Sequence, residues 1–220
     1  MARVCSYQPS HIRGKRDDSL SRTKMSIVYT IGHSAHPYDK FAGNLEQNKI
    51  EVLVDVRSSP YSKYCPQFDR ELMSRNLQES GMKYLFLGSE LGGRPEKAGY
   101  YDGQGRAVYG RMISDPAFIS GIERLERGIT EFKVAIMCGE EDPTHCHRRL
   151  LVGRVLAERG HIVMHIRADG RTQSDAQLVV ESGKELINAQ PALFAEIDED
   201  QWRSTVSVSP KKARGNSSRS

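Results

Sequence analysis

The feature of this sequence that most limits its fold is an alternation along the chain. Short apolar runs rich in β-branched residues take turns with stretches whose apolar residues recur at helical spacing. Strands joined through helices pair in parallel by right-handed crossovers. The pattern therefore predicts an α/β fold of three layers, a mostly parallel sheet of about five strands with helices on both faces. The expected strands are residues 27–31, 52–56, 84–87, 134–138 and 162–166.

The expected helices follow from apolar spacing and from residues that start or stop helices. Asp115 and Pro116 together form a capping residue and a favoured first helical residue, and Gly81 and Gly160 are typical helix stops. One helix is thus expected to start at Pro116. The others are expected over residues 37–49, 70–79 and 146–159, with a less regular one over 174–188.

Length and charge distribution predict one domain with extensions. A chain of 220 residues suits a single α/β domain, which we expect over residues 26–170. Residues 1–25 are expected to be a disordered basic extension, 171–202 an acidic and partly helical extension, and 203–220 a disordered basic tail. The net charge of +4 lies entirely in the basic ends of the chain. We therefore expect nucleic acid to bind only weakly, through these tails.

Apolar runs and cysteine content bear on the compartment. No apolar run approaches the roughly 20 residues of a membrane helix, and the first 24 residues lack the apolar core of a secretory signal. Four cysteines are too few for a disulfide framework in a chain of this length. We expect no membrane partner and a cytoplasmic location, with thiols free for thiol or metal chemistry.

Polar residues follow four of the expected strands. The carboxyl ends of parallel strands meet at one edge of a sheet, where ligand sites of α/β proteins collect. We therefore expect the loops after residues 31, 54, 87 and 137 to converge on one cleft. The candidate site residues in these loops are His33, Ser34, Asp55, Arg57, Glu90, Arg94, Cys138, Glu140, Cys146, His147 and Arg148.

Several motifs, in order along residues 26–170, resemble the bacterial family known as domain of unknown function 488. They are Thr30-Ile31-Gly32-His33-Ser34, Asp55-Val56-Arg57, Leu91-Gly92-Gly93, Met137-Cys138-x-Glu140-x-x-Pro143-x-x-Cys146-His147-Arg148 and Val163-x-His165-Ile166. The resemblance implies an α/β fold but no reaction, because the family has no settled activity. Cys65 lies outside the family pattern, and so do both tails.

Our first functional hypothesis is a thiol-dependent transferase or hydrolase. Cys146 is expected at a helix start, where the helix dipole and two neighbouring basic residues favour a thiolate that can attack a substrate. Either His33 or His147 would carry protons, and Cys138 and Glu140 would complete the catalytic group. A small anionic ligand, such as a nucleotide, would bind through the remaining candidates, namely Ser34, Asp55, Arg57, Glu90, Arg94 and Arg148.

A metal site is the second hypothesis. Cys138, Cys146 and one histidine, either His33, His145 or His147, would hold a zinc or iron ion, with a fourth place left for water or Glu140. The protein would then be a metal-binding or redox-sensing module without catalytic activity. The spacing between the two cysteines is not a standard zinc pattern. Cys138 at the end of an apolar strand is also compatible with a purely structural, buried role.

A rhodanese-like sulfurtransferase is the third hypothesis, because the order of strand, cysteine, turn and helix is similar. Such enzymes cradle an anion with a cationic residue in or after the loop. Here Thr144 stands six positions after Cys138, and three acidic residues, 140–142, would repel the anion.

For Asp55 and Arg57 a simple ion pair is an equal alternative to ligand binding, since alternate residues of a strand point the same way.

Overall fold

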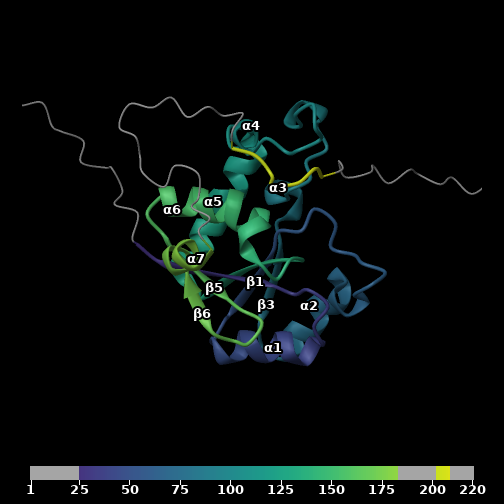
Figure 1. The fold of residues 1–220 in the computed structure, drawn as a ribbon. Coiled ribbons are helices and arrows are strands. Elements are labelled where there is room, and N and C mark those ends of the chain that lie inside the picture. Colours follow the sequence, from purple (N-terminus) through teal and green to yellow (C-terminus); the bar gives the residue numbers. More distant parts are fainter. Residues whose placement is uncertain (1–24, 183–201, 209–220) are drawn as a thin grey trace, which may run out of the picture.

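A computed structural model of the chain describes residues 25–182 and 202–208. Its centre is a six-stranded sheet in the order β3-β2-β4-β1-β5-β6 (Figure 1). The first five strands pair in parallel, and β6 pairs antiparallel with β5. The strands are β1 Ile27–Gly32, β2 Val52–Asp55, β3 Lys83–Phe86, β4 Val134–Cys138, β5 Ile162–Ile166 and β6 Thr172–Ser174.

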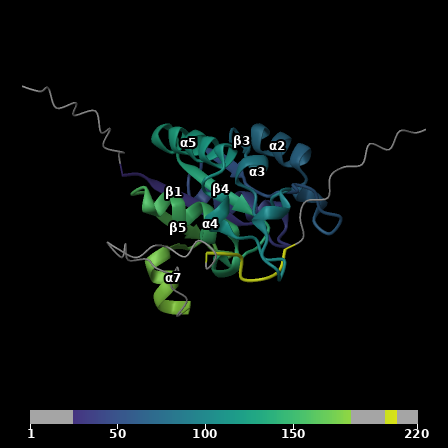
Figure 2. The same ribbon diagram turned by 90° about the horizontal axis from the view of Figure 1, so that it is seen from above.

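Helices cover both faces of the sheet and confirm the predicted three-layer α/β fold (Figure 1). Apolar residues of α1 and α2 pack with one side of the strands, and those of α3, α4, α5 and α6 pack with the other side. In Figure 2, seen from above, α7 lies on the β5 side of the domain, and it contacts both β5 and β6. The helices are α1 Tyr38–Gln47, α2 Arg70–Glu79, α3 Gly88–Leu91, α4 Tyr109–Met112, α5 Pro116–Glu131, α6 Arg154–Glu158 and α7 Asp175–Ser182.

Strand register brings the carboxyl ends of the central strands to one edge. Gly32 pairs with Cys138, and Asp55 pairs with Met137. The backbone N–H of His33 then donates to the Cys138 carbonyl oxygen at 3.1 Å, which continues the pairing beyond β1. The loops that carry the candidate residues of β1, β2 and β4 therefore start side by side, as the strand pattern predicts.

The chain after β4 differs from the single helix expected over 146–159. A short turn, Pro143–His145, precedes a π-helix, Arg148–Gly153, which continues into α6. Cys146 itself is extended, and its carbonyl oxygen accepts from the N–H groups of Arg149 and Leu150 at 3.0 and 2.9 Å. Cys146 thus lies at the start of the helical segment, as expected, but before its first turn.

Beyond residue 170, α7 lies within the helix expected over 174–188, but the described residues pack on the domain instead of forming separate extensions. β6 and α7 continue the domain past residue 170, and the segment 202–208 packs against it. Trp202 is 6% exposed and joins the apolar core beneath α4 and α5, and Arg203 forms a β-bridge with Val108. We call residues 202–208 the C-terminal strap. The rest of the expected extensions, residues 1–24, 183–201 and 209–220, lies outside the described part of the chain.

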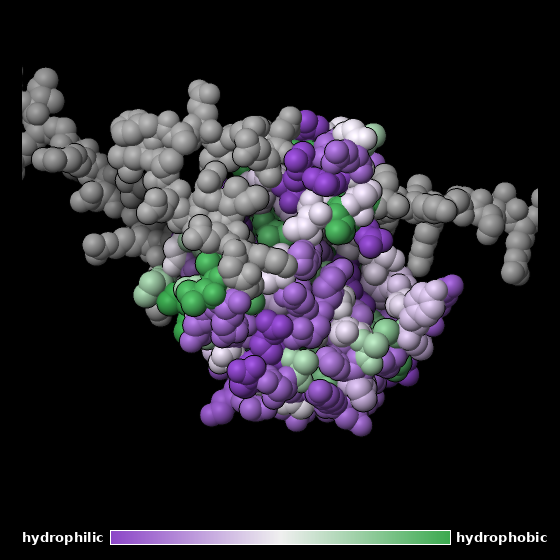
Figure 3. Space-filling view, viewed as in Figure 1, coloured by the Kyte–Doolittle hydropathy of each residue, from purple (hydrophilic) through white to green (hydrophobic). Residues whose placement is uncertain are grey.

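The surface in Figure 3 is mostly hydrophilic, with apolar side chains in small groups. Among the described residues, no helix combines the length and the apolar character that crossing a bilayer requires.

Candidate functional site

A cavity of about 450 Å³ opens at the carboxyl edge of β1, β2 and β4. Loops after these three strands contribute to its wall, as does the loop around Arg94. The predicted convergence of strand ends on one cleft is therefore present in the structure. Six of the candidate residues line the cavity, namely His33, Arg57, Arg94, Cys138, Glu140 and His147.

Four side chains with metal-binding or nucleophilic atoms meet beside this cavity, and three of them lie in its wall. We call Cys138, Glu140, Cys146 and His147 the thiol cluster. Glu140 Oε2 lies 3.0 Å from Cys138 Sγ and 3.1 Å from Cys146 Sγ. His147 Nδ1 lies 3.5 Å from Cys138 Sγ, and one ligand atom from each residue lies within 4.8 Å of all the others. Cys138 ends β4, whereas the other three belong to the turn and helix start that follow.

A hydrogen bond on the side of the ring away from the sulfurs fixes the orientation of His147. Its Nε2 lies 3.0 Å from the carbonyl oxygen of Val56, which directly follows β2. A carbonyl can only accept a hydrogen bond, so Nε2 carries the proton. The lone pair of the neutral ring is then on Nδ1, which faces the sulfurs. Gly93 allows this packing, because a Cβ at that position would lie 2.6 Å from Cγ of the His147 ring.

The charges of the thiol cluster are coupled. Burial raises the pKa of the Cys146 thiol, but the hydrogen bond with Cys138 and the charges of Arg148 and His147 bring it well below its usual value. The hydrogen bond with Cys146, together with burial, raises the pKa of Cys138 well above its usual value. Burial lowers the pKa of His147, but its hydrogen bond and charge interaction with Cys146 raise it above the usual value overall. Without a metal, the cluster therefore favours a thiolate on Cys146 beside a protonated His147.

Arg148 holds the loop that carries Glu140. Its side chain is fully buried, and its guanidinium donates to the carbonyl oxygens of Glu140 and Glu141, the latter at 2.6 Å. Its Nε also donates to Thr30 Oγ1 at 3.4 Å. Arg148 does not line the cavity. The expectation that it binds a ligand is therefore not supported, because its donors are already used by the backbone of the loop.

Asp55 and Arg57 form the ion pair that the sequence offered as an alternative to ligand binding. Arg57 Nη2 donates to Asp55 Oδ2 at 2.7 Å, and Asp55 is fully buried. Tyr84 Oη donates to the same carboxylate at 2.7 Å, and Arg57 Nη2 also donates to the Phe68 carbonyl at 2.8 Å. Asp55 thus positions Arg57 rather than meeting a ligand. Arg57 itself reaches the cavity wall.

His33 belongs to the same network and is held neutral. Its Nδ1 donates to the Ser34 carbonyl at 2.7 Å, and its Nε2 accepts from Arg57 Nη1 at 3.1 Å. Burial, with the nearby Arg57 charge, lowers the pKa of His33 to about 4. The ring also stacks on Phe68 at 4.4 Å. With both ring nitrogens bonded, His33 is poorly placed to carry protons, so that expectation is not supported.

Comparison of the sequence with family models identifies a known family. A model described as domain of unknown function DUF488 matches residues 37–155, about half of the chain. The protein belongs to the DUF488 family. The match includes the whole thiol cluster and confirms the resemblance seen in the sequence motifs. Searches of curated proteins and of solved structures each gave no match.

Two candidate residues of the DUF488 domain lie away from the cavity. Glu90, on α3, lines a separate cavity of about 430 Å³ together with residues near the start of α5. Ser34 has a positive φ of 46° and bonds through its backbone to Gly139, and it does not line the thiol-cluster cavity. The ligand-binding roles expected of Glu90 and Ser34 are therefore not supported by their positions.

Arg94, which is expected to bind a ligand, lies in the cavity wall. Its backbone N–H donates to Ser58 Oγ at 2.9 Å, which fixes the loop. Its side chain lines the cavity and is exposed, and no hydrogen bond or ion pair engages its guanidinium among the described residues. Of the basic candidates, Arg94 is therefore the one whose guanidinium is available to an anionic ligand.

Two parts of the cavity wall are not among the candidate residues predicted from the sequence. Tyr109 is one of them; it is 2% exposed and lines the cavity. The C-terminal strap contributes Ser204, Val206, Ser207 and Val208. Tyr109 and Met112 are three residues apart, a spacing that indicates one buried face of a helix. The serine-rich strap gives no such signal, because its composition resembles that of a disordered tail.

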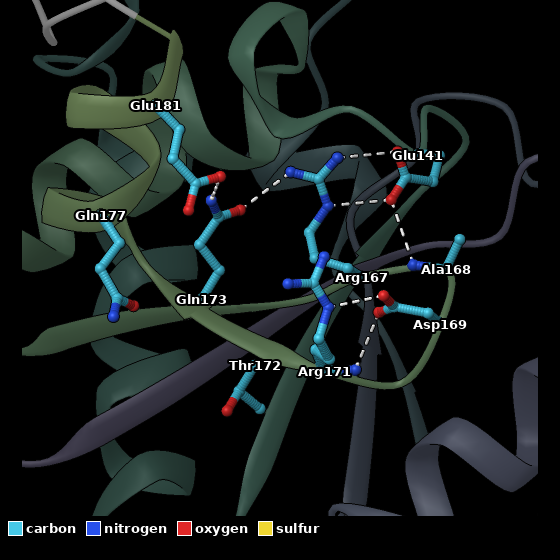
Figure 4. Close-up of a pocket in the computed structure, with 9 residues that line it drawn as sticks. All are labelled: Glu141, Arg167, Ala168, Asp169, Arg171, Thr172, Gln173, Gln177 and Glu181. Carbon is cyan, nitrogen blue, oxygen red and sulfur yellow. Dashed lines mark hydrogen bonds and ion pairs between the residues drawn. The ribbon is translucent and has the colours of Figure 1, made fainter.

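A further cavity of about 430 Å³ lies beside the other face of the loop that carries Glu140 (Figure 4). Arg167 makes a two-point ion pair with Glu141, at 3.0 and 3.1 Å, and Arg171 pairs with Asp169 at 2.6 Å. Figure 4 shows these charged side chains directed at one another. Within the described part of the chain, the wall of this cavity has no cysteine or histidine. The Arg167–Glu141 pair braces the loop that carries Glu140.

Proposed function

We propose that this DUF488 domain binds a divalent metal ion at the thiol cluster and that this ion catalyses a reaction of a small anionic ligand in the cavity. The observation that carries the proposal is the convergence of two sulfurs, a carboxylate and an imidazole within 4.8 Å, with His147 Nδ1 turned to the sulfurs by the Val56 carbonyl. Metal-bound histidines commonly have such a carbonyl partner on the second ring nitrogen.

The donor set favours zinc. Thiolate and imidazole are the usual zinc ligands, and a carboxylate oxygen completes a tetrahedral set with them. A divalent ion would also offset the negative charge that gathers in the metal-free cluster, where an oxygen of Glu140 lies close to both sulfurs. An iron ion would accept the same donors and is distinguished from zinc by metal analysis.

The direction in which the cluster faces favours a catalytic rather than a purely structural ion. Cys138, Glu140 and His147 line the cavity, while Cys146 lies behind them and is 1% exposed. Glu140 is the exposed member of the cluster and so is the ligand best placed to exchange with water. Zinc lowers the pKa of bound water to about 7, which supplies a nucleophile for hydrolysis. Arg94 would bind the anionic group of the substrate.

The test is metal analysis of untagged protein purified without chelators. We expect about one equivalent of zinc per chain, and loss of most of it in Cys146→Ser and His147→Ala. The matched control is Cys65→Ser, because Cys65 is a free cysteine outside the cluster. Wild-type protein that neither retains nor takes up a divalent ion would contradict the proposal.

A redox dithiol is the second candidate, favoured by the two sulfurs that share one carboxylate neighbour. A peroxide would oxidise Cys138 and Cys146 to a disulfide and be reduced to water and an alcohol, or to two waters for hydrogen peroxide, with both thiol protons transferred to oxygen. Metal-free protein that loses two thiols on peroxide treatment, in a background where Cys5→Ser and Cys65→Ser leave Cys138 and Cys146 as the two cysteines, would favour this function. Attack by Cys146 on a cavity ligand is less favoured, because Cys146 does not line the cavity. The same geometry, with Glu140 against both sulfurs, disfavours rhodanese-like persulfide chemistry.

A further inference from the structure

The C-terminal strap crosses the mouth of the thiol-cluster cavity, and we propose that it limits the size of the ligand that reaches the cluster. This inference concerns the substrate of the site proposed above, so it rests on that proposed function. The strap lies outside the residues that match the family model. It therefore adds to the cavity a wall that would select ligands by size and that lies outside the family match.

The first end of the strap is anchored by Trp202. Its indole Nε1 donates to the Leu150 carbonyl at 2.7 Å, and the Arg154 guanidinium lies 4.0 Å from the ring. Its carbonyl oxygen accepts from the Tyr109 N–H at 2.6 Å. Trp202 thus ties the strap to the helical segment after Cys146 and to the start of α4. In Figures 1 and 2 the strap, in yellow, lies beside α4.

Backbone pairing then holds the strap along one rim of the cavity. The Ser204 N–H donates to the Ala107 carbonyl at 2.8 Å, and Ser204 Oγ accepts from the Ala107 N–H at 3.0 Å. At the far end, the Val208 N–H donates to the Gly105 carbonyl at 2.9 Å. Val208 also packs against the apolar core. The strap is therefore fixed at both ends, and its middle residues span the distance between them.

The middle of the strap faces the thiol cluster across the cavity. Ser204, Val206 and Ser207 line the same cavity as Cys138 and His147. Thr205 Oγ1 lies 3.3 Å from His145 Nδ1, in the turn that precedes Cys146. The strap thus approaches the loop that carries the cluster and completes the wall opposite it. Val206 is 59% exposed, so its side chain borders both solvent and cavity and can be enlarged without disturbing the core.

This arrangement has a definite consequence for ligand size. The strap contributes four of the residues that bound a cavity of about 450 Å³, at the lower end of the range for small-molecule sites. Compact anions would fit beside Arg94 with the strap in place. Bulky ligands would need it removed or displaced. The apolar side chains of Val206 and Val208 would contact the part of the ligand remote from the cluster. The hydroxyls of Ser204 and Ser207 are already used, because they donate to the carbonyl oxygens of Val206 and Gly105.

The experiment uses Cys138, which lines the cavity, as an internal reporter in metal-free protein. All reactions are run at one alkaline pH, because both reagents attack the thiolate form. Iodoacetamide is the small reagent and fluorescein maleimide the bulky one, with modification of Cys138 followed by tandem mass spectrometry. A chain ending at Arg203 lacks the lining residues of the strap but keeps Trp202. Its matched control ends at Val208, so that both chains lack residues 209–220. Val206→Trp tests the strap without truncation, with Val180→Trp as its control at another exposed valine.

We expect the chain ending at Arg203 to react with the bulky reagent about tenfold faster than the chain ending at Val208, with a smaller change for iodoacetamide. Val206→Trp should slow the bulky reagent, and Val180→Trp should not. Equal rates for the two truncated chains, or for the two tryptophan variants, would overturn the proposal. Because the measurement is made without metal, its failure is separate from a failure to find zinc.

Discussion

At the scale of single residues, the position of Glu140 depends on two residues that never meet a ligand. Arg148 binds the Glu140 carbonyl from one side, and Gly32 at the end of β1 packs against the same carbonyl from the other. A Cβ at Gly32 would lie 1.8 Å from that oxygen and 2.7 Å from Cα of Glu141. Both contacts are with backbone, which cannot rotate away. The absence of a side chain at Gly32 is therefore a requirement of the site.

We predict that Gly32→Ala displaces the loop and weakens metal binding. Overpacking of this kind costs about 1–3 kcal/mol in the free energy of unfolding. The measurements are urea unfolding and zinc content after purification. The control is Gly43→Ala in α1, where a Cβ meets nothing within 4 Å. That change should keep the zinc and stabilise the protein by about 0.5–1 kcal/mol, because alanine favours the helix. Full zinc content in Gly32→Ala would contradict the role given to Gly32.

The residue types of the thiol cluster could be predicted from the sequence, but several roles could not. Cys138, Glu140, Cys146 and His147 follow one strand closely, so the rule for strand ends places them together. A buried arginine that holds a loop has the same sequence signature as an arginine that binds an anion. Arg148 was therefore assigned to the ligand, although its donors are used by backbone carbonyls.

At the scale of elements, the hairpin of β5 and β6 and the helix α7 are joined to the site by a buried polar chain. Thr30 Oγ1 lies 2.8 Å from His165 Nδ1, and His165 Nε2 lies 3.1 Å from Asp175 Oδ1. Arg149 Nε donates to Asp175 at 2.5 Å and is almost fully buried. Thr30 also accepts from Arg148, so α7 is connected to the loop that carries Glu140.

Removing the carboxylate of Asp175 should therefore be costly. Asp175→Ala leaves the buried Arg149 without this ion pair and should lower the free energy of unfolding by about 3 kcal/mol. The control is Asp169→Ala, since Asp169 pairs with Arg171 at the surface, where the two side chains are 53% and 79% exposed. Such exposed pairs commonly contribute nothing measurable. Denaturant unfolding of both variants checks this, and equal losses would show that burial does not set the contribution of the Asp175 pair.

The elements that were predicted and those that were missed differ in how they bury apolar residues. All five parallel strands occur where expected. The central strands β2 and β4 are apolar runs because both of their faces are covered, whereas β3 at the sheet edge is only partly buried. β6 has the polar sequence Thr172-Gln173-Ser174 and is short, so no periodicity marks it. It exists because β5 offers an edge with backbone groups to pair.

At the scale of the whole molecule, the site is assembled from distant parts of the chain. The matched DUF488 region supplies the thiol cluster, whereas His33 precedes that region and the C-terminal strap follows it by about fifty residues. Trp202 could have been recognised as an apolar anchor in an otherwise polar tail. Its partner could not be predicted, because contacts between segments so far apart in sequence leave no local pattern.

Such an assembly predicts that metal binding stabilises the entire domain. The four donors come together only in the folded chain, so an ion that binds there favours the native state by mass action. At a free zinc concentration one hundred times the dissociation constant, the gain is about 2.7 kcal/mol. Chelation of zinc should therefore lower the melting temperature of wild-type protein and of Cys65→Ser alike. Cys146→Ser should melt at the same temperature with and without chelator, since it has lost a ligand. A wild-type melting temperature unchanged by chelation of zinc-loaded protein would mean that the cluster does not couple metal binding to folding.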